Sequence, residues 1–447
     1  VSNRYCLLES VEGGERWGRY SFLGYDPLVH IVCKDHVVTT EYADGRRESV
    51  TTDQPNDILR ALMAQYKAPR IEGFPPFTGG LVGYYAYRMI GYAEPTLHLR
   101  SSDVDDFDLM LFDKVIAYDH LSQKINVIVN MPTDNVLENY GTARAEIEKM
   151  IRLIREPMQL PTAHKHCKPQ FTCNVTKEEY CDIVNKTKQH IVDGDIFQAV
   201  LSRRFETPYT DSLLDAYRVL RTTNPSPYMV YLHRDDIELM STSPETLVRL
   251  RNGRLSTFPV AGSRPRGADK EEDLALEKDL LSDEKELAEH NMLVDLGRND
   301  IGKLSQFGSV EVTDYQMIHR YSRIMHITSV VEGNILPKFD AFDAISTLLP
   351  AGTLSGAPKI RACEIIEELE PCARGVYGGA LGYVDFTGNM DTCIAIRMAV
   401  KKNDRVTIQA GGGIVADSVP ENEYMESQNK AGAVIAAIER AAEVDAD

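Results

Sequence analysis

Apolar residues recur along this chain with two periods, one typical of strands and one typical of helices. In the first third, short apolar runs separated by glycine and aspartate turns predict strands at residues 28–33, 37–40, 109–112, 115–118 and 124–131. Residues 138–155 instead carry apolar side chains three and four positions apart, which predicts a helix. Further along, strands and helices mix without regular alternation. This pattern favours an α+β fold with a largely antiparallel sheet over a doubly wound fold.

A proline-rich segment divides the sequence into two regions. Residues 157–170 contain three prolines and no apolar periodicity, as is typical of a linker. A helix is predicted directly after it, at residues 176–192, because Thr176 and Glu179 form a capping-box pattern. We therefore expect an N-terminal region at residues 1–156 and a second region at residues 171–447.

Composition excludes some classes of function. The chain has 447 residues, with 49 Lys and Arg against 67 Asp and Glu, and its net charge is −18. Nonspecific binding to nucleic acids or anionic membranes needs clustered cations, so we expect no nucleic-acid and no membrane partner. No apolar run reaches the roughly 18 residues of a membrane span. The same charge argues at first against the binding of small anions.

The eight cysteines are scattered, and a chain of this size does not need disulfides. We therefore expect a reduced, cytoplasmic protein. The first residues lack the apolar core of a signal peptide and an initiator Met, so we also expect a trimmed chain. Four possible zinc ligands lie in or near the linker, but their spacing matches no common zinc site and favours an ordinary linker: His164, His166, Cys167 and Cys173.

A glycine-rich segment at residues 352–359 resembles a phosphate-binding loop but fails its requirements. The spacing of its glycines is one residue short, and a proline separates Gly356 from Lys359. Ile360 also stands where a Ser or Thr would bind Mg²⁺. We therefore predict a tight turn that opens a helix at residues 358–369 rather than a nucleotide site.

Two pairs of glutamates are candidates for a metal site. Glu286 and Glu289 lie three residues apart on a helix that should begin near residues 282–284. Glu423 and Glu426 repeat this spacing on a helix that should begin at residue 420. Each pair leads into apolar positions on the same helix face, and a buried carboxylate needs a partner such as Mg²⁺. Two solvated acidic helix faces are the alternative, and the sequence does not decide whether the helices meet.

Three further features could bind an anion. Arg397 stands among small residues on one face of a strand predicted at residues 391–400, where it could hold a carboxylate or a structural salt bridge. The glycines at 411–413 could let a backbone approach a ligand, although a hairpin turn also explains them. His326 lies in an apolar run, where a histidine is more often a core residue than a catalyst. Together with Mg²⁺, these parts indicate a small polyanionic substrate.

Several longer motifs resemble those of the chorismate-utilising enzymes, and most closely the large subunits of anthranilate synthases. The matching segments, in the order of that family, are residues 259–267, 286–300, 352–359, 377–383, 391–397 and 409–413. The resemblance covers nearly the whole chain. It implies large antiparallel sheets packed against each other with helices outside. It also implies a lyase that converts chorismate and ammonia to anthranilate and pyruvate, the first committed step of tryptophan biosynthesis.

The resemblance also implies roles for individual residues. Glu289 and Glu426 would ligate Mg²⁺, and Glu423 would assist them directly or through water. His326, Glu286 and Lys430 would take part in catalysis. The substrate would contact the remaining positions that match the family: Gly262, Ser263, Arg264, Tyr377, Arg397, Gly411, Gly412 and Gly413.

Two positions separate the reactions within this family. Gln198 stands where isochorismate and salicylate synthases resemble one another in having a lysine base, and a neutral amide cannot take a proton from water. Ala261 stands where aminodeoxychorismate synthases typically have a lysine nucleophile. Both residues favour direct addition of ammonia. An aminodeoxychorismate or aminodeoxyisochorismate synthase remains the alternative, and a subunit that only senses tryptophan is disfavoured by the intact set of site residues.

Regulation and partners follow from the same resemblance. Four residues match the family's tryptophan feedback pocket, to which the N-terminal region would contribute: Ser10, Pro227, Tyr228 and Met229. The chain carries no nucleophile motif of a glutaminase. Ammonia would therefore come from a separate glutamine amidotransferase subunit, and we expect a hetero-oligomer.

Overall fold

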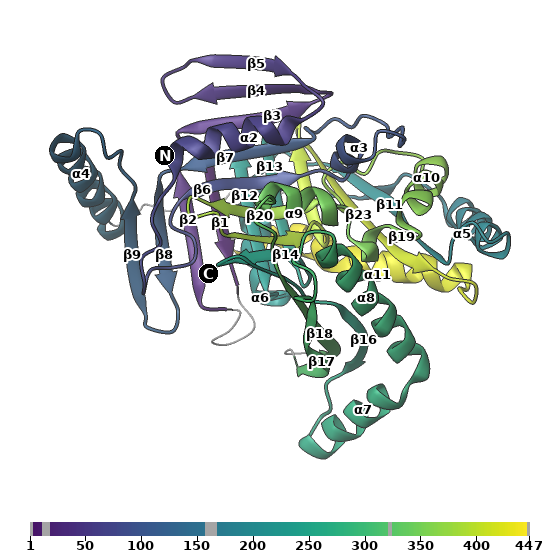
Figure 1. The fold of residues 1–447 in the computed structure, drawn as a ribbon. Coiled ribbons are helices and arrows are strands. Elements are labelled where there is room, and N and C mark those ends of the chain that lie inside the picture. Colours follow the sequence, from purple (N-terminus) through teal and green to yellow (C-terminus); the bar gives the residue numbers. More distant parts are fainter. Residues whose placement is uncertain (1–2, 11–17, 157–167, 321–323, 445–447) are drawn as a thin grey trace.

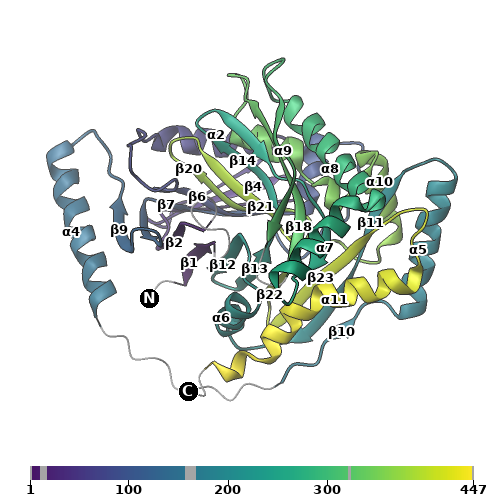
Figure 2. The same ribbon diagram turned by 90° about the horizontal axis from the view of Figure 1, so that it is seen from below.

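Two large β-sheets organise the chain, and every strand pairing among the described residues is antiparallel (Figure 1). The computed structural model describes residues 3–10, 18–156, 168–320 and 324–444. Helices cover the outer faces of the two sheets, as Figure 2 shows for α6 and α11 on one side and for α2 and α9 on the other. This arrangement confirms the predicted α+β fold class.

The first sheet contains eleven strands in the described residues. In spatial order they are β10 (Thr172–Cys173), β11 (Gln198–Pro208), β23 (Arg405–Ile414), β22 (Met398–Lys402), β13 (Ile237–Ser243), β12 (Tyr228–Arg234), β1 (Arg4–Glu9), β2 (Tyr20–Tyr25), β8 (Lys114–Asp119) and β9 (Lys124–Val129), with β19 (Gly356–Ala357) paired to β11.

The second sheet contains twelve strands in the same part of the chain. Their order is β16 (Val260–Pro265), β18 (Ile324–Asn334), β15 (Arg254–Thr257), β14 (Thr246–Arg251), β21 (Met390–Ile394), β20 (Ala380–Asp385), β6 (Gly80–Tyr85), β7 (Phe107–Phe112), β3 (Val29–Lys34), β4 (Val37–Tyr42) and β5 (Arg47–Thr51), with β17 (Glu311–Arg320) paired to β18.

The five helices that the sequence predicts, α4, α5, α8, α10 and α11, begin within two residues of the predicted positions. In α5 the Glu179 amide donates to the Thr176 hydroxyl and the Thr176 amide donates to the Glu179 carboxylate, so the predicted capping box is confirmed. No helix in the described part of the chain combines the length and the apolar character needed to cross a membrane. The α-helices are α2 (Pro55–Met63), α3 (Ile90–Ala93), α4 (Val136–Arg155), α5 (Lys177–Val192), α6 (Leu213–Thr223), α7 (Lys270–Ser282), α8 (Glu284–Gly302), α9 (Ala341–Leu348), α10 (Lys359–Leu369) and α11 (Pro420–Glu439).

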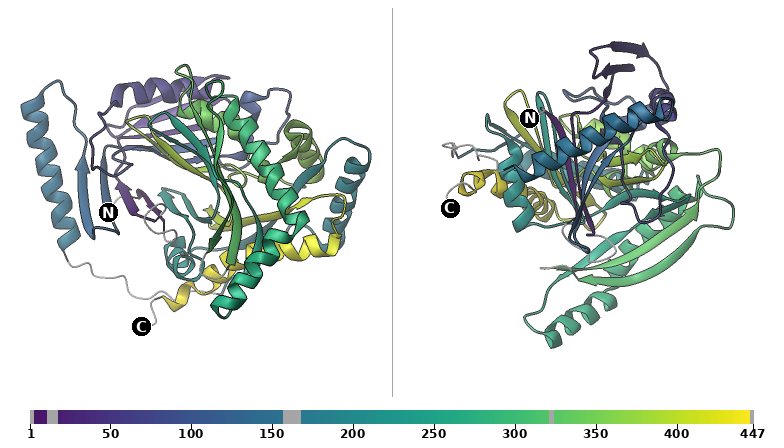
Figure 3. Two further views of the ribbon diagram at one scale, coloured as in Figure 1. Left: turned by 60° about the horizontal axis from the view of Figure 1, so that its bottom comes forward. Right: turned by 90° about the vertical axis from the view of Figure 1, so that its left-hand side faces the viewer.

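The two sequence regions on either side of the predicted linker share both sheets. β1 of the first region pairs with β12 of the second, and β6 pairs with β20. Apolar side chains from both regions fill the core between the sheets, and Figure 3 shows this layering from two further directions. The division therefore separates stretches of sequence rather than layers of the fold. Residues 157–167, with His164, His166 and Cys167, lie outside the described residues.

The single strand predicted at residues 391–400 is wrong. β21 ends at Ile394 in the second sheet, and β22 begins at Met398 in the first sheet, so the chain changes sheets between them. Ile394 packs on the outer face of its sheet, whereas Met398 packs between the sheets. The apolar alternation continues across this break because both ends are buried, which is why the pattern resembles one strand.

Candidate active site

Arg397 lies in the short segment that carries the chain from one sheet to the other. Its φ of 46° is in the left-handed region, which is costly for a residue with a Cβ and marks a position fixed by its surroundings. Burial lowers the pKa of Arg397, and the charge of Glu245 opposes that effect. A half-buried guanidinium at a crossing between two layers can bind a carboxylate strongly.

Glu245 is a site residue that the sequence analysis missed. It directly precedes β14, and its carboxylate accepts a hydrogen bond from the Thr353 hydroxyl at 3.0 Å. Burial raises the pKa of Glu245 to about 7, while Thr353, Arg397 and Lys430 act in the opposite direction. A half-buried acid with this pKa can donate or accept a proton near neutral pH. The only signal in the sequence is a single acid between two apolar strand segments.

His326 lies on β18 opposite Ser263 of β16. Gly262 forms a bulge beside it with a φ of 74°, and its carbonyl oxygen lies 3.1 Å from His326 Nδ1. Burial lowers the pKa of His326, the Gly262 carbonyl opposes this, and the charge of Arg397 lowers it further. The imidazole is therefore neutral near pH 7. Because the charge of Arg397 acts on His326, the two side chains lie near each other.

The three glycines at 411–413 lie inside β23 and pair with β11, so the hairpin-turn alternative is wrong. Their missing side chains make room for neighbouring polar groups. A Cβ at Gly412 would lie 3.0 Å from Glu423 Oε2 and 3.4 Å from Glu426 Oε1. A Cβ at Gly413 would lie 2.5 Å from the side-chain nitrogen of Gln198. The absence of side chains at these glycines therefore lets Glu423, Glu426 and Gln198 pack closely against the backbone of β23.

Lys430 joins α11 to this glycine strand. Its ammonium group donates to the Gly411 carbonyl at 3.1 Å and pairs with Glu426 at 2.7 Å. Its charge also acts on Glu245, as the lowering effect on the Glu245 pKa shows. Lys430 is thus close to the acid, the glycines and one candidate metal ligand.

The other helix with a glutamate pair begins as predicted. The Asp283 side chain caps α8 by accepting hydrogen bonds from the amides of Lys285 and Glu286. Arg264 is held by Asp279 and Asp283, at 2.7 and 2.9 Å, so its guanidinium faces the start of α8. Its predicted contact with substrate stays a prediction.

The two glutamate pairs lie at the starts of α8 and α11. Burial, followed by the nearby charge of Glu289, raises the pKa of Glu286. Burial also raises the pKa of Glu423; a hydrogen bond from Ser418 opposes this, and the charge of Glu426 adds to it. Lys285 of α8 acts on Glu423 of α11, so these helix starts are close enough to interact.

The prediction that both members of each pair face inward is half correct. Glu286 and Glu423 are half-buried, whereas Glu289 and Glu426 are exposed. No three acidic, histidine or cysteine side chains among the described residues lie close enough together to hold a metal ion. The chemistry of the donors nevertheless fits a divalent cation, because the charges within each pair oppose ionisation and the start of α8 lies close enough to α11 for Lys285 to act on Glu423.

Tyr377 is buried on the loop that follows α10. This loop is tied to the segment that carries Arg397, because the Gly378 amide donates to the Ala395 carbonyl and the Ala395 amide donates to the Gly379 carbonyl, both at 2.9 Å. The Arg374 guanidinium lies 5.7 Å from the centre of the Tyr377 ring. The predicted positions Tyr377 and Arg397 are thus linked through the backbone.

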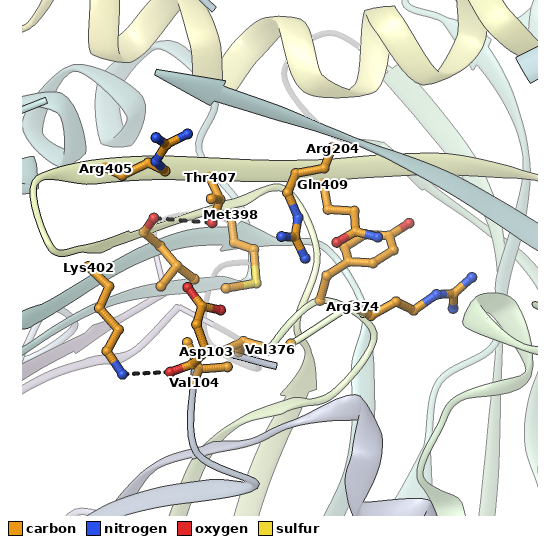
Figure 4. A pocket seen from close by; sticks show the side chains of 13 residues that line it. Asp103, Val104, Arg204, Arg374, Val376, Met398, Lys402, Arg405, Thr407 and Gln409 are labelled. Carbon is orange, nitrogen blue, oxygen red and sulfur yellow. Dashed lines mark hydrogen bonds between the residues drawn. The ribbon is translucent and has the colours of Figure 1, made fainter. Parts of the chain in front are cut away.

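A small pocket with several cationic side chains is lined in part by Tyr377, and Figure 4 shows it from close by. Its volume is about 40 Å³, which is room for a few water molecules. Arg374 is paired with Glu370 at 2.7 Å and Arg405 with Glu206 at 2.8 Å, while Lys402 donates to the Asp103 carbonyl. These cations already have protein partners, so we assign the pocket a structural role.

The four residues predicted to bind tryptophan line one cavity of about 950 Å³: Ser10, Pro227, Tyr228 and Met229. β1 brings its end beside the start of β12, with Glu9 opposite Met229. The Ser10 hydroxyl is buried and has no hydrogen-bond partner among the described residues. The cavity therefore offers an unsatisfied hydroxyl and apolar walls, whereas the Glu9 carboxylate is held by Tyr217 and Arg221 of α6.

Comparisons with known proteins agree with this arrangement. Residues 6–436 match the family described as chorismate binding enzyme. The chain is 46% identical to anthranilate synthase component 1 of Acetivibrio thermocellus, covering 98% of this chain and 90% of that protein, and 45% identical to that of Pseudomonas aeruginosa, covering 97% and 89%.

Two solved structures share the fold. The crystal structure of anthranilate synthase component I from Streptococcus pneumoniae superposes with a TM-score of 0.84 and 37% identity over 95% of both chains. The menaquinone-specific isochorismate synthase MenF of Escherichia coli superposes with a TM-score of 0.72 at 18% identity, over 98% of this chain and 89% of that one. The chain belongs to the chorismate-binding enzymes.

Proposed function

We propose that this protein is the large subunit of an anthranilate synthase, which forms anthranilate and pyruvate from chorismate and ammonia. The observation that carries this proposal is the 43–46% identity, over nearly the whole chain, to proteins named anthranilate synthase component 1. Gln198 and Ala261 support it, because neither side chain can activate water or form a covalent adduct.

The half-buried cation of Arg397 binds a carboxylate of chorismate in this proposal. Tyr377 and the backbone at residues 411–413 complete that end of the site, since the Tyr377 loop is tied to the segment of Arg397 and β23 pairs with β22, which begins directly after Arg397. Lys430 and the bulge at Gly262 border the same space.

Two titratable groups divide the proton transfers. Ammonia adds at C2 while the 4-hydroxyl group leaves as water, and protonated Glu245 supplies the proton for that departure. Its pKa of about 7 leaves a large fraction of it protonated at neutral pH. Neutral His326 accepts a proton from the added ammonia. Loss of the C2 proton and of pyruvate then gives the aromatic product.

Mg²⁺ is the proposed cofactor. Glu289 and Glu426 would hold it, with Glu286 and Glu423 beside them. When bound, the cation would neutralise the ring carboxylate of chorismate. Raised pKa values at Glu286 and Glu423 support this assignment, because clustered carboxylates are stabilised in their charged form by a divalent cation.

Two partners complete the proposal. A glutamine amidotransferase subunit supplies ammonia, as the name component 1 of the relatives suggests. Tryptophan binds in the cavity lined by Ser10, Pro227, Tyr228 and Met229 and inhibits the enzyme. Apolar walls suit an indole, and the free Ser10 hydroxyl suits a polar group of the amino acid.

One incubation tests the proposed reaction. The purified chain is mixed with chorismate, Mg²⁺ and ammonium at alkaline pH, and anthranilate fluorescence and pyruvate are recorded. Equimolar anthranilate and pyruvate are expected. A stable amino-substituted intermediate without pyruvate would instead identify an aminodeoxychorismate or aminodeoxyisochorismate synthase.

A further inference from the structure

Three consecutive residues of β13 hold the segment that carries Arg397. The Ser243 hydroxyl donates to the Ile394 carbonyl at 2.7 Å, and the Ser241 hydroxyl donates to the Ile396 carbonyl at 2.9 Å. Between them, the Thr242 amide donates to the Arg397 carbonyl at 3.1 Å. All three residues of β13 are fully buried. We call residues 241–243 the β13 clamp.

The clamp explains how Arg397 keeps its left-handed backbone. The segment between β21 and β22 lies outside the ladders of both sheets, so its carbonyl groups need other partners. The Ser241 hydroxyl supplies one of them at Ile396, and the Ser243 hydroxyl holds Ile394, the last residue of β21. Each bond fixes the backbone within three residues of Arg397, and together they determine where the guanidinium points.

The same clamp contacts the walls of the tryptophan cavity. Tyr228 and Met229, which line that cavity, pair across the ladder with Ser243 and Thr242. The Thr242 hydroxyl donates to the Asn224 carbonyl at 2.6 Å, at the start of the segment that leads into Pro227. Thr242 thus holds the Arg397 segment with its backbone and the cavity segment with its side chain.

We propose that the β13 clamp positions Arg397 for the substrate carboxylate and that the bond from Thr242 to Asn224 couples this position to occupancy of the effector cavity. The coupling rests on the proposed function for both ligands. A ligand in the cavity contacts Pro227, Tyr228 and Met229 and favours one arrangement of that segment. The Asn224 carbonyl moves with the segment, and Thr242 transmits the change across a single strand to Arg397.

Thr242→Val tests the coupling. Valine has nearly the shape of threonine, so the variant loses the bond to Asn224 but keeps the amide that holds Arg397. Thr242→Ser is the matched control, because it keeps the hydroxyl and loses only a methyl group. Inhibition by tryptophan is measured relative to each variant's own uninhibited rate, and tryptophan binding is measured separately by equilibrium dialysis. Thr242→Ala provides a second hydroxyl-free variant if valine disturbs folding.

The tryptophan concentration for half inhibition is expected to rise at least about tenfold in Thr242→Val and to change little in Thr242→Ser. Tryptophan should still bind Thr242→Val, and chorismate should no longer weaken that binding, because coupling is reciprocal. Inhibition of Thr242→Val and Thr242→Ala at wild-type tryptophan concentrations would overturn the coupling alone. A wild-type enzyme that binds no tryptophan would overturn the effector assignment as well.

Ser241→Ala and Ser243→Ala test the positioning role without tryptophan. Each should raise the KM for chorismate by about tenfold and change kcat by less than about twofold, since the substrate is held less well but reacts through the same groups. Equal losses in kcat and in stability, with an unchanged KM, would show that the hydroxyls only stabilise the fold and would overturn the positioning role.

Discussion

The two halves of the active site are built on different principles. Arg397, Glu245 and His326 are borne by the two sheets, lie partly or fully buried and have perturbed pKa values. The proposed metal-binding half lies at the starts of α8 and α11, where Glu426 has 49% of its side chain exposed. The sheets thus provide a prearranged half, whereas in the proposed function a cation would draw the helix half together.

This difference has a physical basis. A buried side chain between two sheets is fixed by close packing and by hydrogen bonds on several sides. Carboxylates at the start of a helix repel one another until a cation is present, and exposed side chains keep their rotamer freedom. Changes in the sheet half should therefore reduce turnover strongly, and changes in the helix half should act through the metal.

Removing the cation of the sheet half should have the largest effect. Arg397→Ala is expected to lower kcat/KM for chorismate by about 10³-fold, because the substrate carboxylate would lose its half-buried partner. Arg397→Lys keeps the charge but loses the forked geometry, and it should recover part of this loss. Steady-state kinetics give both values. A kcat/KM of Arg397→Ala within tenfold of the wild-type value would contradict the role of Arg397 in holding the substrate carboxylate.

Glu245→Gln is expected to lower kcat by about 10²-fold, because the amide cannot supply a proton to the leaving hydroxyl. An acid must be protonated to act, so wild-type kcat/KM, expressed per free ammonia, should fall as the pH rises above about 7. The variant should lack this limb. A profile of kcat/KM against pH from pH 6 to 9 checks the expectation. If kcat/KM falls in the same way in both enzymes, a group other than Glu245 causes the fall.

Removal of the cation should affect binding more than fold. Chelation with EDTA is expected to weaken chorismate binding by about 30-fold, since the carboxylates of Glu286 and Glu423 would then repel the substrate. The unfolding temperature should stay nearly constant, because neither sheet depends on the metal. Calorimetric titration with chorismate and a thermal melt distinguish the two effects. A large drop in melting temperature would show a structural metal instead.

The smallest expected effect concerns the glycine strand. Gly412→Ala would place a methyl group 3.0 Å from Glu423 and should weaken Mg²⁺ activation by about tenfold. Gly302→Ala is the matched control, because nothing lies within 4 Å of a Cβ there. Activity as a function of Mg²⁺ concentration distinguishes the two variants. Identical activation curves for both would show that β23 does not affect Mg²⁺ binding.

The sequence predicts the position of the helix half better than that of the sheet half. The starts of α8 and α11 follow from capping residues and from a proline, which act locally. Glu245 and the crossing at Arg397 depend on contacts between strands far apart in the sequence, and no local pattern records such contacts. The apolar alternation through residues 391–400 even concealed the crossing.

The charge argument failed for a related reason. A net charge of −18 describes the whole chain, whereas the charges of Arg397 and Lys430 both act on Glu245 at one place in the fold. The overall charge says nothing about which residues the fold brings together there. The glycines at 411–413 show the same limit, because only the pairing of β23 with β11 reveals why they must be small.

The most direct test of the central claim is a titration of Mg²⁺ into metal-free enzyme at fixed chorismate and ammonium, followed by anthranilate fluorescence. If a prearranged sheet half and a cation-dependent helix half act on one substrate, anthranilate should be absent with EDTA and should appear in proportion to bound Mg²⁺. Anthranilate formed at an undiminished rate in EDTA, or no anthranilate at saturating Mg²⁺, would contradict the account.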